Sequence, residues 1–146
     1  MCSRLILISR PAGWAKNRMI FIIDESPTDI ELTTIALEAT DREIVVHSAT
    51  DGKSALAMLR NGLGVPALIL LDLKMPGMSG IEMLREIRAD DRLGGLPVVV
   101  VTSSSLESDR AEAIAVGASG YIQKPLSLDQ FSKDLESILL SWLPNY

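Results

Sequence analysis

The sequence of 146 residues is poor in cysteine, histidine and aromatic side chains, and this scarcity excludes several kinds of site. The single cysteine, Cys2, cannot form a disulfide within the chain, so the fold does not require an oxidising compartment. His47 is the only histidine, so a zinc site would lack its usual ligands. We expect His47 to be a surface residue near the end of an edge strand.

Long apolar runs and excess positive charge are also missing. No segment approaches the roughly 18–20 apolar residues of a membrane span, and Leu5–Ile8 is too short for a signal-peptide core. The chain has 14 basic and 19 acidic residues, a net charge of -5, and therefore no overall field that attracts nucleic acid or anionic lipid. We expect a cytoplasmic protein with neither a nucleic-acid nor a membrane partner.

The first eighteen residues differ in composition from the rest. They contain Arg4, Arg10, Lys16 and Arg18 and no acidic residue, which leaves ten basic and 19 acidic residues for the remainder. The segment is either a basic targeting arm or a tail outside the fold, with Met19 as a possible true start. The absence of helical or strand periodicity favours the second interpretation. We assign residues 1–18 to a tail and residues 19–146 to one folded domain.

From Met19 onward, short apolar runs alternate five times with segments of helical spacing. The predicted strands are Met19–Asp24, Glu43–His47, Ala67–Leu71, Val98–Val101 and Gly120–Gln123, and the predicted helices are Pro27–Thr40, Gly52–Arg60, Ser79–Ala89, Leu106–Val116 and Leu128–Leu143. Strands that are apolar throughout are typical of a parallel sheet covered by helices on both faces. Crossovers between parallel strands need helices and are right-handed. The alternation therefore predicts an α/β sandwich of three layers.

Polar side chains stand where four of these strands end. They are Asp24 and Glu25, then Asp72, Thr102 and Lys124. Ligands of open α/β sheets bind at the carboxyl ends of the strands, so we expect these residues to meet at one edge.

Three carboxylates at one edge repel one another unless a cation neutralises them. Oxygen ligands suit Mg²⁺, which takes one or two carboxylates with water and phosphate oxygens. A carboxylate beside such a metal can attack phosphorus and form an aspartyl phosphate, while a lysine and a hydroxyl bind the phosphoryl oxygens. A single acid at a strand end is more often a cap or turn residue; the joint occurrence at four strand ends favours a phosphoryl-transfer site.

The segments FIIDES, LILLDLKMPGMSGIEML, VVVVTSSS and GASGYIQKP resemble the receiver domain of two-component response regulators, over residues 19–143. The resemblance implies a doubly wound, flavodoxin-like (βα)5 fold whose parallel sheet has five strands in the order 2-1-3-4-5. More weakly, DESPTDIEL and the apolar tail SILLSWL are similar to receivers of the cyanobacterial phytochrome type.

The resemblance also implies a role for each site residue. Asp72 is the phosphoacceptor, and Thr102 and Lys124 bind the phosphoryl group. Thr102 and Tyr121 form the switch, and the bond before Pro125 is expected to be cis. The ligands of Mg²⁺ are Asp24, Glu25, Asp72 and the backbone carbonyl of Lys74.

The sequence departs from the family's usual pattern at several positions, among them Glu25 and Ser103, which follows Thr102 where Ala or Gly is common. The second acid of the pair is more often Asp, and the longer Glu25 changes how the metal is held. Lys74 and Ser104 occupy positions that, in the family, modulate the lifetime of the phosphoryl group.

The implied function is that of a response regulator phosphorylated by a histidine kinase or a phosphotransfer protein, with changed binding or dimerisation as its output. It is not an enzyme beyond its own phosphorylation and dephosphorylation. Two alternatives stay open: a phosphorylation-independent interaction module, which Glu25 alone supports, and a magnesium phosphohydrolase acting on external substrates.

The last predicted helix is apolar over an unusually wide arc. We expect a core-facing stripe of Leu128, Phe131, Leu135, Ile138 and Trp142, widened by Leu139, Leu140 and Leu143. A stripe much wider than about 100° exceeds what covering one sheet requires. It indicates either a loosely packed terminal helix or a homodimer interface, which would comprise the fourth helix, the fifth strand and the fifth helix.

Overall fold

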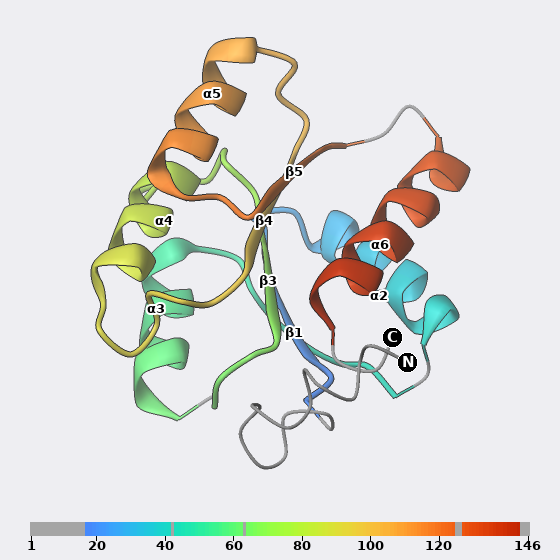
Figure 1. The fold of residues 1–146 in the computed structure, drawn as a ribbon, viewed down its shortest axis with the longest axis horizontal. Coiled ribbons are helices and arrows are strands. Elements are labelled where there is room, and N and C mark those ends of the chain that lie inside the picture. The colour runs from blue at the N-terminus through green and yellow to red at the C-terminus, as the bar shows by residue number, and fades with distance from the viewer. Residues whose placement is uncertain (1–16, 42, 63, 125–126, 144–146) are drawn as a thin grey trace, which may run out of the picture.

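The computed structural model describes residues 17–41, 43–62, 64–124 and 127–143. The described chain forms one parallel sheet of five strands in the order β2-β1-β3-β4-β5, with helices on both faces (Figure 1). The predicted fold class and strand order are therefore confirmed.

The elements alternate along the chain. The strands are β1 (Met19–Ile23), β2 (Val45–Ala49), β3 (Leu68–Leu71), β4 (Val98–Thr102) and β5 (Gly120–Gln123). The helices are α2 (Pro27–Thr40), α3 (Gly52–Asn61), α4 (Gly80–Ala89), α5 (Glu107–Val116) and α6 (Leu128–Trp142).

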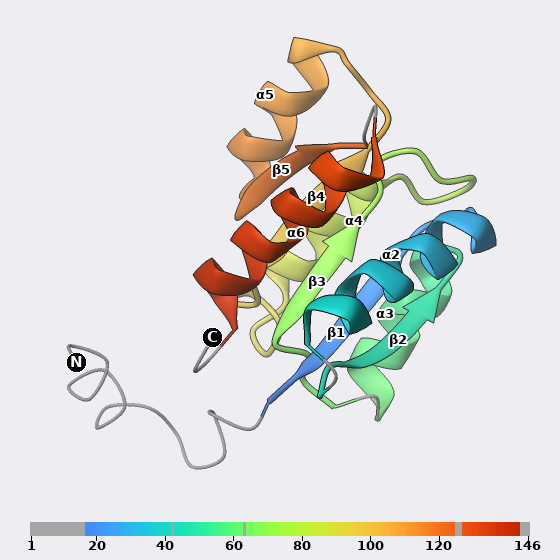
Figure 2. The same cartoon turned by 90° about the vertical axis from the view of Figure 1, so that its right-hand side faces the viewer.

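The helices divide between the two faces of the sheet. Helices α3, α4 and α5 lie on one face, and α2 and α6 lie side by side on the other (Figures 1 and 2). Successive residues of β1 point to opposite faces, so Phe21 packs in the core under α3 and α4 while Ile20 and Ile22 pack in the core under α2 and α6. Strands β3 and β4 are buried along their whole length, as their apolar sequences predict.

Side-chain caps fix where most helices begin. Ser26, Asp51, Ser79 and Ser127 each accept a hydrogen bond from a backbone N–H in the first turn of the helix that follows. Pro27 then occupies the first turn of α2, where its missing N–H costs nothing. These caps set the helix starts at the same edge as the carboxyl ends of the strands.

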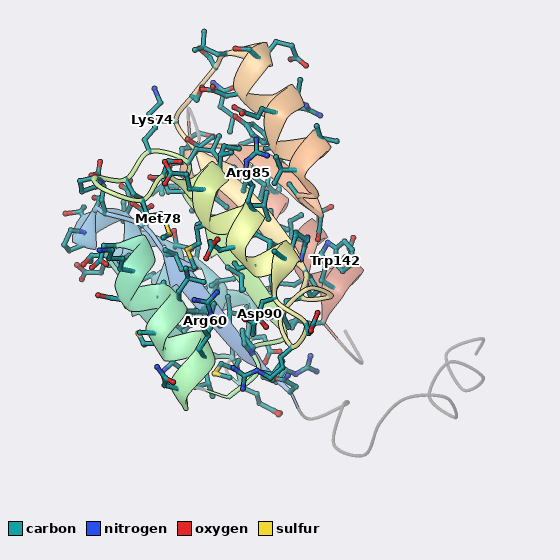
Figure 3. The ribbon with its side chains drawn as sticks, turned by 90° about the vertical axis from the view of Figure 1, so that its left-hand side faces the viewer. Arg60, Lys74, Met78, Arg85, Asp90 and Trp142 are labelled. Atoms are coloured by element: carbon teal, nitrogen blue, oxygen red, sulfur yellow. The ribbon has the colours of Figure 1, made fainter. Side chains whose placement is uncertain are left out.

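At the opposite edge of the sheet, a half-buried arginine forms hydrogen bonds with two loops. The guanidinium of Arg88, on α4, donates to the carbonyls of Leu96 at 2.6 Å, Gly117 at 2.8 Å and Gly94 at 3.1 Å. These carbonyls lie in the loops that enter β4 and β5. On the surface nearby, Arg60 of α3 pairs with Asp90 at 3.3 Å (Figure 3).

Two sequence expectations are wrong in detail. The second strand is Val45–Ala49, not Glu43–His47, so His47 lies in the middle of β2; it is exposed, as expected. The shift arises because Ile44 is buried just before the strand begins, whereas β2 itself is a largely exposed edge strand. An edge strand lacks the continuous apolar run that marks its ends in the sequence.

The face that α6 turns to the core also differs from the expectation. Phe131, Leu135 and Leu139 are its buried residues, whereas Leu128 and Trp142 are 64% and 37% exposed. Steps of four residues place the buried three on one face. Because apolar residues surround much of this helix, their spacing did not determine which face packs on the sheet.

Most of the predicted tail lies outside the described residues. Its last two residues contact the domain: the Asn17 side chain donates to the carbonyl of Val65, and Arg18 pairs with Asp41 at 3.6 Å. The boundary at Met19 stays a prediction. Within the described residues, no helix has the length and apolarity needed to cross a membrane.

Candidate functional site at the carboxyl edge of the sheet

The predicted site residues converge because four neighbouring strands end together. The N–H of Asp72 donates to the carbonyl of Ile23, the last residue of β1. The N–H of Lys124 donates to the carbonyl of Thr102, the last residue of β4. The backbone of the sheet thus brings Asp24, Asp72, Thr102 and Lys124 to one edge.

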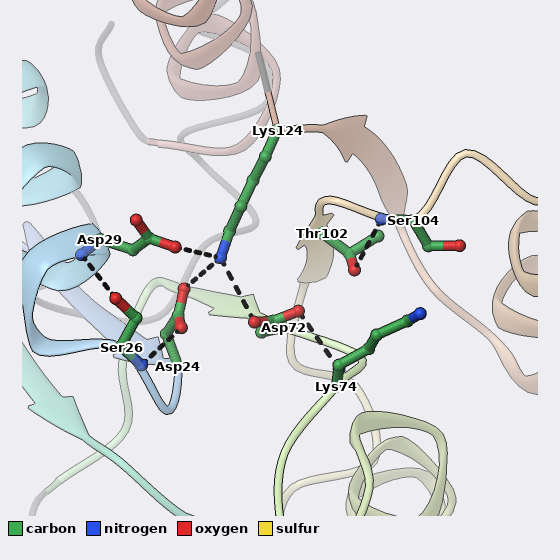
Figure 4. Close-up of polar contacts among 8 residues, drawn as sticks. All are labelled: Asp24, Ser26, Asp29, Asp72, Lys74, Thr102, Ser104 and Lys124. Atoms are coloured by element: carbon green, nitrogen blue, oxygen red, sulfur yellow. Dashed lines mark hydrogen bonds and ion pairs between the residues drawn. The ribbon is translucent and has the colours of Figure 1, made fainter.

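The ammonium of Lys124 is the centre of the cluster. Its Nζ lies 2.7 Å from Oδ2 of Asp24, 2.8 Å from Oδ2 of Asp29 and 3.3 Å from Oδ2 of Asp72 (Figure 4). The side chains of Asp24 and Asp72 are 7% and 8% exposed, and that of Asp29 is 39% exposed. Two of these ion pairs are therefore largely shielded from water, and the third is partly screened by it.

Both buried carboxylates also accept backbone hydrogen bonds. Oδ1 of Asp24 accepts from the N–H of Ser26 at 2.9 Å, and Oδ1 of Asp72 accepts from the N–H of Lys74 at 3.2 Å. These bonds fix the orientation of each carboxylate and leave one oxygen of each directed at Lys124.

Burial and charge oppose each other in the ionisation of the cluster. Burial raises the pKa of Asp24, and the nearby Asp72 charge adds to the rise, against the lowering effect of Lys124. Burial alone would lower the pKa of Lys124, but hydrogen bonds to Asp24 and Asp29 and the charge of Asp72 outweigh it and raise that pKa. Lys124 is accordingly a fixed positive charge at neutral pH.

The donor set fits a divalent cation. Three carboxylates around one ammonium leave two negative charges without compensation, and all the available donors are oxygens. Glu25, the fourth acid, is exposed and has no hydrogen-bond or ion-pair partner among the described residues. In the part of the chain that the structure describes, no three Asp, Glu, His or Cys side chains form a ready-made metal cluster. A metal would therefore be shared between carboxylates that now face Lys124.

Lys74 has a backbone role in this arrangement and an exposed side chain. Its N–H bonds Asp72, while its side chain points outward at the edge of the sheet (Figures 3 and 4). The metal assignments to Asp24, Glu25, Asp72 and the Lys74 carbonyl stay predictions.

The two predicted switch residues both form hydrogen bonds with Ser104, in the loop after β4. The hydroxyl of Thr102, which is fully buried, accepts from the N–H of Ser104 at 3.4 Å. The hydroxyl of Tyr121 donates to the carbonyl of the same Ser104 at 3.5 Å, and its ring lies 5.6 Å from the Arg110 guanidinium. Burial, followed by the charge of Asp109, raises the pKa of Tyr121. One residue, Ser104, thus connects Thr102 to Tyr121.

Asp29 is the site residue that sequence reasoning missed. It stands three residues after the cap Ser26, whose hydroxyl oxygen accepts the Asp29 N–H at 3.2 Å. This spacing places an acid in the first turn of α2, above the end of β1. The Ser26-x-x-Asp29 pattern was therefore the available signal. The predicted cis bond before Pro125 falls on a residue outside those described.

Glycine is required where α4 passes the backbone that follows β3. A Cβ on Gly80 would overlap the carbonyl oxygen of Asp72 and lie 2.6 Å from Cα of Leu73. The N–H of Gly80 also donates to the carbonyl of Leu73 at 2.9 Å. The start of α4 therefore presses directly on the backbone that carries Asp72.

Comparison with known proteins agrees with this geometry. The profile of the response regulator receiver domain matches residues 20–136. The chain is 34% identical to the chemotaxis protein CheY-3 of Vibrio cholerae over 126 residues, which cover 84% of this chain and 92% of that protein.

Two solved structures have closely similar folds. The phosphorylated cyanobacterial phytochrome response regulator RcpA superposes with a TM-score of 0.80 at 33% identity, covering 86% of this chain and 94% of RcpA. The Mn²⁺-bound form of the response regulator Rcp1 superposes with a TM-score of 0.78 at 30% identity, covering 88% and 96%. The similarity to the cyanobacterial phytochrome type, expected from short segments, is confirmed.

Proposed function

This chain belongs to the response regulator receiver family, and from that premise we propose that it accepts a phosphoryl group on Asp72. Receiver domains are typically signalling modules without enzymatic activity of their own, and they interact with histidine kinases or phosphotransfer proteins. The observation that carries the proposal is the shared ion pair, in which Lys124 joins the buried Asp72 to Asp24 at one edge of the sheet.

In the transfer, an oxygen of the Asp72 carboxylate attacks phosphorus. The bond from phosphorus to the donor breaks, and its electron pair leaves with the donor, a histidine nitrogen or the oxygen of a small acyl phosphate. The N–H of Lys74 holds Oδ1 of Asp72, so Oδ2 is the oxygen beside the ammonium. Lys124 then offsets the negative charge that accumulates on the phosphoryl oxygens.

We propose Mg²⁺ as the cofactor. The residues that would hold it are Asp24, Asp72, the carbonyl of Lys74 and, after turning inward, Glu25. When bound, it supplies positive charge that offsets the repulsion between the buried carboxylates and an incoming phosphoryl group. The Mn²⁺-bound Rcp1 structure supports a divalent cation in this fold.

The proposed readout runs through Thr102. Its buried hydroxyl lies at the end of β4, next to the strand that carries Asp72, and it bonds Ser104, which also bonds Tyr121. A phosphoryl group that draws Thr102 toward Asp72 would break the Ser104 bond and change the environment of Tyr121. The switch then shifts an existing equilibrium of the loop between β4 and α5.

We further propose that the face formed by α5, β5 and α6 mediates homodimerisation, in the cytoplasm where its phosphodonor would act. Leu106, at the start of α5, and Ile114 are exposed, and so are Leu128, Leu140 and Trp142 of α6. These residues lie on the two helices on either side of the edge strand β5, and exposed apolar residues are typical of interaction surfaces.

The decisive test of the function is incorporation of phosphate. Wild-type protein incubated with acetyl phosphate and Mg²⁺ should gain the mass of one phosphoryl group, and Asp72→Asn should gain none. Asp129→Asn is the matched control, because Asp129 is an exposed acid at the start of α6 that does not contact Lys124. Equal labelling of wild type and Asp72→Asn contradicts the proposal. An unlabelled wild type that still dimerises favours the phosphorylation-independent module instead.

A further inference from the structure

Helix α2 supplies a partner to Lys124 that competes with the phosphoacceptor. Asp29 lies 2.8 Å from the ammonium, closer than Asp72 at 3.3 Å. The ammonium is therefore held mainly between Asp24 and Asp29, on the α2 side of the cluster (Figure 4).

The position of Asp29 is fixed by the start of α2. Its N–H bonds the hydroxyl oxygen of Ser26, and the N–H of Ser26 bonds Asp24, so the three residues form one connected unit. The backbone of Asp29 is thus fixed on the first turn of α2, and its short side chain limits how far the carboxylate can follow Lys124 when the ammonium moves. Lys124, in contrast, has a flexible stem of four carbons and moves readily between partners.

We propose that Asp29 is a positioning residue that holds Lys124 on the α2 side of the cluster, and so weakens its ion pair with Asp72, until Asp72 carries a phosphoryl group. This inference rests on the proposed function. An unmodified Asp72 contributes one negative charge, and a phosphoryl group on it adds about one more, together with further acceptor oxygens. The added charge shifts the balance, so Lys124 leaves Asp29 for the phosphoryl group. Breaking the Asp29–Lys124 ion pair thereby offsets part of the free energy that Lys124 gains from the phosphoryl group.

The test uses beryllofluoride, which mimics a phosphoryl group on a carboxylate, at saturating Mg²⁺. Asp29→Asn keeps the backbone cap but removes the competing charge, and should bind beryllofluoride about two- to fivefold more tightly than wild type. The effect is modest because Asp29 is 39% exposed and its ion pair is partly screened. Asp29→Glu keeps the charge and should restore wild-type affinity.

A matched control separates competition from a general change in charge. Glu31→Gln removes one exposed acid from the same helix without touching Lys124, so it should leave the affinity within error of wild type. A second readout needs no phosphoryl mimic. The Nζ resonance of Lys124, assigned with Lys124→Arg, should lie nearer its beryllofluoride-bound position in free Asp29→Asn than in free wild type.

The outcomes distinguish this inference from the function on which it rests. A wild-type chain that takes up no beryllofluoride overturns both. Uptake by wild type, with an unchanged affinity and an unchanged Lys124 resonance in Asp29→Asn, overturns the role of Asp29 alone. An equal gain in Glu31→Gln also overturns it, because the effect would then be one of net charge.

Discussion

Replacing Gly80 with alanine tests whether the start of α4 and the backbone of Asp72 are as closely packed as the structure indicates. The new Cβ would overlap the Asp72 carbonyl oxygen and crowd Cα of Leu73, both of which are backbone atoms next to a buried strand. Neither can rotate away as a side chain would. Overpacking of this kind costs typically about 1–3 kcal/mol, and we expect Gly80→Ala to lie at the upper end, about 3 kcal/mol.

Two other glycines provide matched controls. A Cβ on Gly95 meets nothing within 4 Å, so Gly95→Ala should be neutral or stabilise the protein by up to about 1 kcal/mol. The three atoms nearest to a Cβ on Gly52 belong to the side chain of Met78, at 3.0–3.1 Å, and none is a backbone atom, so Gly52→Ala should cost less than Gly80→Ala. Like Gly80, Gly52 is the first residue of a helix, so the comparison also controls for helix propensity.

The assay is urea unfolding followed by circular dichroism, with thermal unfolding as a second measure. The loss expected for Gly80→Ala corresponds to a fall of roughly 10 °C in Tm for a domain of this size. A Gly80→Ala protein as stable as Gly95→Ala would refute the reasoning, because the close approach of α4 to the Asp72 backbone would then not exist.

Three further predictions concern other parts of the molecule. Arg88→Lys should lower the free energy of unfolding by about 1–3 kcal/mol in urea titrations, because an ammonium cannot reach all the carbonyls that the guanidinium bonds, whereas the exposed Arg85→Lys should change it little. Hydrogen bonds from the first turn of α3 lower the pKa of Asp51. The contribution of this ionised carboxylate to stability is therefore present above its unfolded pKa and is lost as pH falls through its folded pKa. The difference in unfolding free energy between wild type and Asp51→Asn should be present at pH 7 and shrink below about pH 4. Sedimentation velocity should show Leu140→Glu shifted toward monomer, with Leu32→Glu, an exposed apolar change on α2, as the unaffected control; an unchanged Leu140→Glu would argue against the proposed dimer face.

Much of the fold could be predicted because central strands and capped helices leave strong signals. Strands β3 and β4 are buried along their whole length because both of their faces are covered, so their sequences are apolar. Ser26 and Ser79 are N-cap residues, which indicate where α2 and α4 begin. The edge strand β2 carries only a weak signal, and its bounds were displaced by two residues along the chain. The orientation of α6 depends on the elements that pack against it, and the spacing of its own apolar residues does not determine which face they cover.

The site was predictable wherever a residue ends a strand. Asp24, Asp72, Thr102 and Lys124 meet because parallel strands finish at one edge. Asp29 was not predicted because its contact depends on the placement of α2 relative to the residue after β5, at a separation of 95 residues along the chain. That Lys124 is shared among three carboxylates is likewise a property of the packed helices and strands, not of any one motif.

In the proposed function, Asp72 is the residue that carries the phosphoryl group. The most direct measurement is reduction of the phosphorylated protein with borohydride, which converts an aspartyl phosphate to homoserine, followed by peptide mass spectrometry. We expect homoserine at position 72 alone, formed only after treatment with the phosphodonor and Mg²⁺. Homoserine at Asp24 or Asp29, or its absence from a phosphorylated sample, would contradict it.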